Sequence, residues 1–262
     1  MNKKTLAIFD LTDCEGCEVE LFSLRKSADW KIINKYFNII NWRLADEKAE
    51  NLNFDVALIE GSPASKKEIA FLKKIRAKSK ILIAFGACAC IGGIPAMIDE
   101  HKKEALLAYV YGKNYRSEFI SAKPLSHYIA IDYQLSGCPV NPKEVKQILL
   151  DIAHDKPLKE KSYSVCFECK ARHNDCLFIH GKPCLGPVTK AGCGAICPAK
   201  GLRCYGCWGQ VADANVLGMI IALKKQGHTK KQIRKIMDIF WKQSDGYEKY
   251  LKELIKIKIK LY

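Results

Sequence analysis

The pattern of apolar and polar positions divides residues 5–154 into short strand-like and helix-like segments. Strands are predicted where apolar runs are bounded by polar residues or glycine: Thr5–Leu11, Asn38–Leu44, Phe54–Ile59, Lys80–Phe85 and Tyr128–Leu135. Helices are predicted where apolar residues recur at helical spacing: Glu15–Lys26, Ser65–Lys78, His101–Tyr111 and Pro142–His154. Strands that alternate with helices are typical of βαβ units, so the pattern predicts an α/β fold with a doubly wound parallel sheet.

The pattern changes after residue 154. Residues 155–165 are polar and charged, which indicates a linker, and the segment Cys166–Cys207 is rich in cysteine, glycine and proline. The C-terminal part is predicted to form helices at Ala212–Lys225 and Thr229–Gln243, followed by a segment that fits a strand or a helix, Tyr247–Tyr262. We therefore predict two domains: a sheet domain over residues 1–154 and a small, loop-rich domain with C-terminal helices over residues 155–262.

Eight of the thirteen cysteines lie in the loop-rich segment: Cys166, Cys169, Cys176, Cys184, Cys193, Cys197, Cys204 and Cys207. Four thiolates hold one [4Fe–4S] cluster, so eight can hold two. Structural zinc, which also takes four thiolates, and a disulfide framework are the alternatives. Glycine and proline between the cysteines allow the tight turns that a chain needs to wrap a bulky inorganic group. Spacing alone does not assign each cysteine to one cluster.

The other five cysteines follow the ends of predicted strands. Cys14 and Cys17 come after the first strand, Cys88 and Cys90 after the fourth, and Cys138 after the fifth. Ligands of open α/β sheets bind at the carboxyl ends of the strands, so four of these thiols can hold a third cluster. Cys88 and Cys90 are two residues apart, and an extended backbone would point them the same way. The cysteine left over, Cys90, would then be a small buried hydrophobe.

Composition narrows the class of protein. The 262 residues are 48% hydrophobic and 27% charged, which is typical of a globular chain. No run of eighteen apolar residues is present, and the start MNKKTLAIFDLTDC lacks the features of an export signal, so we expect a cytoplasmic protein without a membrane span. Reducing compartments disfavour disulfides, and thirteen cysteines there favour metal ligation.

The formal net charge of +15 is unevenly distributed. Residues 224–262 contain twelve Lys or Arg and four Asp or Glu, a surplus of +8. A solvated tail, a docking surface for an acidic partner and a nucleic-acid surface are the three interpretations of this surplus. We expect no nucleic-acid partner, because no nucleic-acid-binding motif accompanies the charge. A zinc-stabilised, basic nucleic-acid-binding protein is nevertheless one alternative function.

Several short motifs stand in one order along the chain. They are Cys14-Glu-Gly-Cys17, Gly86-Ala-Cys88-Ala89 with Gly92-Gly93, Gly137-Cys138-Pro139-Val-Asn141-Pro142, Cys184-Leu-Gly186-Pro187 and Cys204-Tyr-Gly-Cys207. This series resembles the small, electron-transferring subunits of nickel–iron hydrogenases and covers about three quarters of the chain. The resemblance is greatest to the cytoplasmic branch, which includes sulfhydrogenase delta subunits and the gamma subunits of F420-reducing and methyl-viologen-reducing hydrogenases. Subunits of complex I-type quinone reductases share the first part of the pattern, and they are the other alternative.

The resemblance implies a flavodoxin-like sheet domain, three [4Fe–4S] clusters and no catalytic residue in this chain. The ligands that it implies are Cys14, Cys17, Cys88 and Cys138 for a proximal cluster, Cys166, Cys169, Cys176 and Cys184 for a distal cluster, and Cys193, Cys197, Cys204 and Cys207 for a medial cluster. Exported family members often have histidine at the place of Cys166 and proline at the place of Cys197. The implied partners are a large subunit with the nickel–iron site and an electron-acceptor subunit that contains flavin or iron–sulfur clusters.

Overall fold

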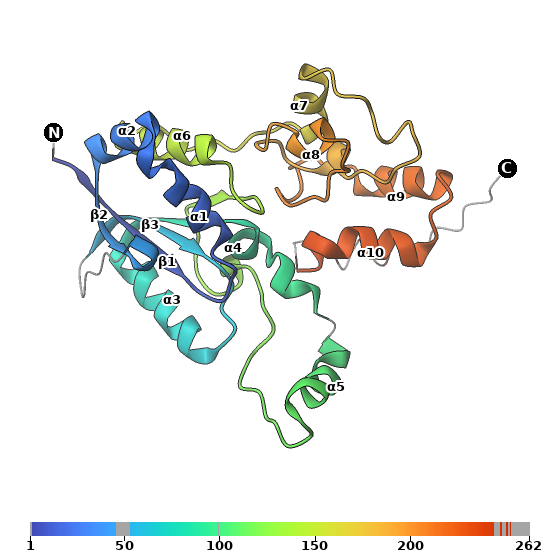
Figure 1. Cartoon of the computed structure of the whole chain (residues 1–262), viewed down its shortest axis with the longest axis horizontal. Coiled ribbons are helices and arrows are strands. Elements are labelled where there is room, and N and C mark those ends of the chain that lie inside the picture. The colour runs from blue at the N-terminus through green and yellow to red at the C-terminus, as the bar shows by residue number, and fades with distance from the viewer. Residues whose placement is uncertain are drawn as a thin grey trace.

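The computed structural model describes residues 2–45, 53–98 and 100–243 and, near the C-terminus, residues 247, 250 and 252; the side chains of residues 100–102 lie outside this description. Figure 1 shows a sheet with helices packed against it and, beside it, a smaller lobe of loops and short helices. Within the described ranges, no helix has both the length and the apolar character needed to cross a membrane.

Five parallel strands form one sheet in the order β2-β1-β3-β4-β5. The strands are β1 (Lys4–Asp10), β2 (Phe37–Trp42), β3 (Phe54–Glu60), β4 (Ser79–Phe85) and β5 (Tyr133–Leu135). Strand order reverses between β1 and β3, which is the switch point of a flavodoxin-like sheet. The predicted fold class is therefore confirmed.

The helices described in the sheet part are α1 (Gly16–Ser23), α2 (Ala28–Tyr36), α3 (Lys66–Lys78), α4 (Ala87–Ile91), α5 (Glu100–Tyr111) and α6 (Pro142–Ala153). Two of them, α2 and the short α4, were not predicted. The strand predicted over Tyr128–Leu135 is too long, because only its last three residues pair with β4.

Side chains of each strand alternate between the two faces of the sheet. On β1, Leu6 and Ile8 are buried against α1, α2 and α6, whereas Ala7 and Phe9 are buried on the face that α3 covers. Because a strand has a side-chain period of two, both faces of this sheet are apolar and both are covered. The loops that carry the cysteines lie at the edge of the sheet formed by the carboxyl ends of the strands.

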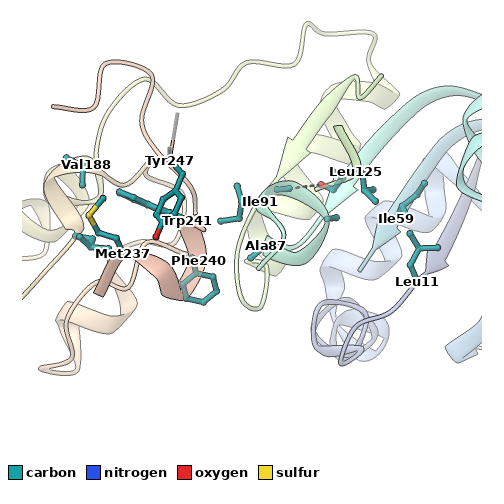
Figure 2. Packing of buried hydrophobic residues seen from close by; sticks show 14 of the residues in the cluster. Leu11, Ile59, Ala87, Ile91, Leu125, Val188, Met237, Phe240, Trp241 and Tyr247 are labelled. Carbon is teal, nitrogen blue, oxygen red and sulfur yellow. Dashed lines mark hydrogen bonds between the residues drawn. The ribbon is translucent and has the colours of Figure 1, made fainter. Parts of the chain in front are cut away.

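The smaller lobe contains α7 (Val165–Ala171), α8 (Ile196–Ala199), α9 (Val216–Lys225) and α10 (Lys230–Trp241). Thr229 closes a capping box with Gln232 at the start of α10. The apolar face of α10 meets the sheet part: Figure 2 shows Phe240 and Trp241 close to Ile91 of α4, and all three residues belong to one buried cluster. The indole N–H of Trp241 donates to the Gly206 carbonyl at 2.9 Å, which ties α10 to the cysteine-rich loop.

The predicted helices at Ala212–Lys225 and Thr229–Gln243 are confirmed with slightly shorter bounds. The segment Tyr247–Tyr262, for which a strand or a helix was predicted, lies mostly outside the described residues. The division into domains at residues 154 and 155 stays a prediction.

Candidate metal centres

Four thiols gather at the carboxyl edge of the sheet. Cys14 lies in the loop after β1, Cys17 in the first turn of α1, Cys88 on α4, and Cys138 in the loop after β5. Burial, together with the nearby negative charges of Cys138 and Cys14, raises the pKa of Cys88 to about 12. Burial also raises the pKa of Cys17, and Glu60 and Cys88 add to that effect. The structure thus brings together the four cysteines of the predicted proximal site.

Two glycines make room for these thiols. Gly86 has a φ of +89°, and a Cβ on it would lie 2.5 Å from the Cys17 Sγ. Gly93 has a φ of +51°, and a Cβ there would lie 3.0 Å from the Cys88 Sγ. Side chains at these two positions would strain the backbone and occupy the space of the thiols. The glycines of the G-x-C-A and G-G motifs therefore shape a cradle around the four sulfurs.

Glu60, at the end of β3, fixes the first turn of α1. Its buried carboxylate accepts the backbone N–H of Cys17 at 3.0 Å and the N–H of Glu18 at 2.8 Å. The first N–H groups of a helix have no partner within the helix, and the Glu15 side chain at its N-cap makes no capping hydrogen bond. Burial raises the pKa of Glu60 to about 7, while the hydrogen bond from the Cys17 N–H opposes this rise. Glu60 thus holds a cysteine loop from a neighbouring strand.

Sequence reasoning missed Glu60 and its neighbour Glu18. Glu18 is buried too, burial raises its pKa to about 7, and it accepts the indole N–H of Trp42 at 2.8 Å. The available signal was Glu60 itself, a charged residue at the end of the apolar run FDVALIE. Lys, Glu, Arg and Asp are almost never fully buried unless paired, so such a position indicates a bonded role.

Cys90 lies away from this group. Cys88 and Cys90 are both on α4, and a helix turns by about 100° per residue, so their side chains leave on opposite sides. The backbone is helical here, so the two thiols do not point the same way as they would on an extended backbone. The Cys90 thiol is buried in the apolar core and donates to the Ala84 carbonyl at 3.3 Å. Burial raises its pKa to about 12.

The four cysteines of the predicted distal site lie on α7 and in the loop that follows it. Cys166 and Cys169 lie on α7, while Cys176 and Cys184 follow in the loop. Burial raises the pKa of Cys166 to about 12, and the charges of Cys184, Cys169 and Cys176 add to this effect. A Cβ on Gly186 would lie 3.2 Å from the Cys166 Sγ and 3.5 Å from the Cys184 Sγ, so glycine again leaves space beside two sulfurs.

The four cysteines of the predicted medial site share one cavity. Cys193, Cys197, Cys204 and Cys207 all line a space of about 590 Å³ between the two parts of the chain. Cys138 of the proximal group lines the same cavity, together with apolar side chains such as Val165, Trp208 and Phe240. A space with four thiols and mostly apolar walls fits a bulky group that thiolates bind.

The three cysteine groups lie next to one another in a row. Cys138, in the proximal group, lines the same cavity as Cys207 of the medial group. The backbone N–H of Cys204 donates to the Cys184 Sγ of the distal group at 3.3 Å. The medial group therefore lies between the proximal and distal groups.

Within the part of the chain that the structure describes, no three His, Cys, Asp or Glu side chains are placed to hold a single metal ion. The four thiolates of a [4Fe–4S] cluster bind four different irons and stand farther apart than the ligands of one ion. The medial donor set, four thiols around a shared cavity, fits such a cluster.

The chain is similar to known proteins over much of its length. A family model of the NADH–ubiquinone oxidoreductase 20 kDa subunit matches residues 14–152. Sulfhydrogenase 2 subunit delta of Pyrococcus furiosus is 37% identical over 84% of this chain and 92% of its own length. A subunit of the F420-non-reducing hydrogenase Vhu of Methanocaldococcus jannaschii is 32% identical over 81% of this chain and 84% of its own length.

A solved structure of an NAD⁺-reducing [NiFe]-hydrogenase contains a chain that is 25% identical to this one, with a TM-score of 0.52 over 60% of this chain and 94% of that chain. The protein belongs to the family of nickel–iron hydrogenase small subunits. As a hydrogenase small subunit it is part of an oxidoreductase, and its family carries iron–sulfur clusters. The resemblance stated from the motifs is confirmed, and the matches of the two relatives extend beyond the segment shared with the 20 kDa subunits.

Proposed function

We propose that this small subunit relays electrons through three [4Fe–4S] clusters between an H2-activating site in a large subunit and a further redox subunit. The row of cysteine groups supports this proposal, because Cys138 lines the same cavity as the medial cysteines and the Cys204 N–H donates to the Cys184 Sγ. When bound, each cluster would accept and release one electron at a potential that its surroundings set.

Twelve cysteines of the chain would bind the three clusters. Cys14, Cys17, Cys88 and Cys138 would hold the proximal cluster, and Glu60 keeps the Cys17 turn in place. The medial cluster would be held by Cys193, Cys197, Cys204 and Cys207, and the distal one by Cys166, Cys169, Cys176 and Cys184. Water is excluded from the buried thiols, such as Cys17, Cys184 and Cys204. Backbone N–H groups that face sulfur, such as that of Cys204, offset part of the cost of burying charge.

Each end of the row has exposed cysteines, which a partner subunit would cover. At the proximal end, Cys14 and Cys138 are exposed at the sheet edge, where a large subunit would cover them. At the distal end, Cys176 is exposed beside Ile179, which is 81% exposed, so an acceptor subunit with flavin or iron–sulfur clusters would approach there. We further propose a cytoplasmic location for the complex.

The division of labour between subunits is tested with the complex and with the single chain. We expect the complex, purified without oxygen through a tag on this chain, to reduce methyl viologen with H2. The chain expressed alone with its clusters is expected to show no H2-dependent reduction, because it supplies thiolate sites for electron transfer and no nickel–iron centre. H2 turnover by the isolated chain would contradict the proposed function.

The metal content tests the three clusters directly. We expect about twelve irons and about twelve acid-labile sulfides per chain, because each of three clusters contains four of both. Elemental analysis and colorimetric sulfide assay of the anaerobic, brown protein check this number. Stoichiometric zinc in a colourless protein would support a structural-zinc interpretation and would contradict the relay.

A further inference from the structure

A segment between α4 and β5 leaves the body of the protein. We define residues 94–98 and 100–119 as the arm: a 3₁₀ turn at Ile94–Met97, the helix α5 and a loop that returns toward the sheet. The arm ends where the Ile120 N–H donates to the Ala64 carbonyl at 2.8 Å. Figure 1 shows α5 away from the sheet and away from the C-terminal helices.

The second half of the arm's helix is apolar but is not buried by its own chain. No side chain between Lys103 and Tyr111 is buried, although this stretch reads KEALLAYVY. Tyr109 is 88% exposed, Val110 64% and Tyr111 63%. These three consecutive residues point in three directions around the helix, so one side of the parent chain could not cover them all.

Such a helix needs packing from another molecule. Isolated helices of about 12 residues are marginal in water, and a helix that is apolar on all sides is normally buried. Single exposed apolar side chains are common, but a contiguous group of them marks an interaction site. Leu106 and Phe119 extend this group along the arm. The first turn of the arm is attached to the rest of the protein, because the Lys242 side chain donates a hydrogen bond to the Met97 carbonyl at 3.3 Å.

The two points where the arm joins the rest of the protein indicate which partner covers it. The arm begins directly after Gly93, which follows the Cys88 turn, and it returns beside Ala64, just after β3. Both points lie at the carboxyl edge of the sheet, where the proximal thiols gather. A subunit that covers this edge would therefore meet the arm as a continuation of the same surface.

The chemistry of the arm fits a stable subunit interface. Its described charged side chains are of both signs, and Tyr109, Val110 and Tyr111 are each more than 60% exposed, so the contact would be mainly apolar. Interface centres are enriched in tyrosine and poor in charge. The basic helix α10 has the opposite character and does not suit the same partner.

We propose that the arm is an anchor that packs into an apolar groove of the H2-activating large subunit. This inference rests on the proposed function, which places that subunit at the proximal edge. The arm would hold the two subunits together without touching the clusters, and α5 would gain its packing only in the complex.

The experiment uses the tagged complex with Tyr109→Ser, Val110→Ser and Tyr111→Ser combined in this chain. We expect nickel recovered with the tagged chain to fall at least about tenfold, because a factor of ten needs only about 1.4 kcal/mol of lost binding and three apolar contacts exceed that. Iron per chain and the acceptor subunit should be retained. A matched control replaces two exposed apolar residues on other helices, Ile32→Ser and Leu217→Ser, and should keep the nickel. Circular dichroism of the isolated variant should show a melting temperature close to that of the unchanged chain, because the replaced side chains are exposed in it.

Each other outcome overturns the anchor. Full nickel recovery with the variant means that the large subunit does not need the arm. Loss of the acceptor subunit alone assigns the arm to that subunit, and a change from dimer to monomer in the isolated chain assigns it to a second copy. Loss of iron means that the arm supports the fold around the clusters. If the complex purified with the unsubstituted chain contains no nickel subunit, the proposed function itself is refuted, and the anchor with it.

Discussion

Replacing Cys88 with alanine is expected to lower the iron content from about twelve to about eight per chain, one four-iron cluster fewer. H2-driven reduction by the complex should fall to background, because the proximal site is the first in the row. Replacing Cys90 with alanine is expected to leave iron content and activity unchanged. The two residues lie on the same short helix, α4, and their side chains leave it on opposite sides. The two variants are therefore a matched pair, in which the same substitution is made on the side of the cluster or on the side of the core.

Cys90→Ala should show its effect in stability alone. The substitution removes a buried sulfur and its hydrogen bond to the Ala84 carbonyl, so we expect the free energy of unfolding to fall by about 1–2 kcal/mol. Iron analysis and chemical denaturation of both variants check these results. The ligand assignment would be wrong if Cys90→Ala lost four irons while Cys88→Ala kept all of them.

The Cys197→Pro variant is expected to convert the medial site to a three-iron cluster. Cys197 lies on α8 and lines the same cavity as Cys193, Cys204 and Cys207, so its loss leaves three thiolates. One iron without a protein ligand should be lost on mild oxidation. Electron paramagnetic resonance should then show a three-iron signal in the variant and none in the intact protein.

A second variant is needed, because proline at position 197 would also change the backbone. A proline at position 197 would place Ile196, a helical residue, before proline, where the helical conformation is disfavoured. Cys197→Ala removes the thiolate and keeps the backbone, so it should give the same three-iron signal. Cluster type and charge set the potential, and we expect the medial potential to rise in both variants. A stoichiometric three-iron signal in the unchanged protein would show that Cys197 is not a ligand.

Local patterns predicted most of the sheet part, and the errors have physical causes. The helix α2 was missed because only Trp30 and Ile33 of its residues are buried, too few to give a clear helical period. The strand over Tyr128–Leu135 was predicted too long because Tyr128, Ile129 and Ile131 are apolar for another reason: they pack against the core without pairing with β4. An apolar run records burial, and it does not record which backbone groups are paired.

The sequence by itself determined the α/β alternation, the positions of five cysteines after predicted strands and the concentration of the other eight beyond residue 165. These features depend on neighbours in the chain, where the periods of strands and helices are visible. Only the tertiary structure decided that α4 separates Cys88 from Cys90, that Glu60 holds the turn of Cys17 from another strand, and that the medial thiols lie between the other two groups. Each of these facts depends on residues distant in the chain or on the direction of a side chain, and neither is encoded in spacing along the sequence.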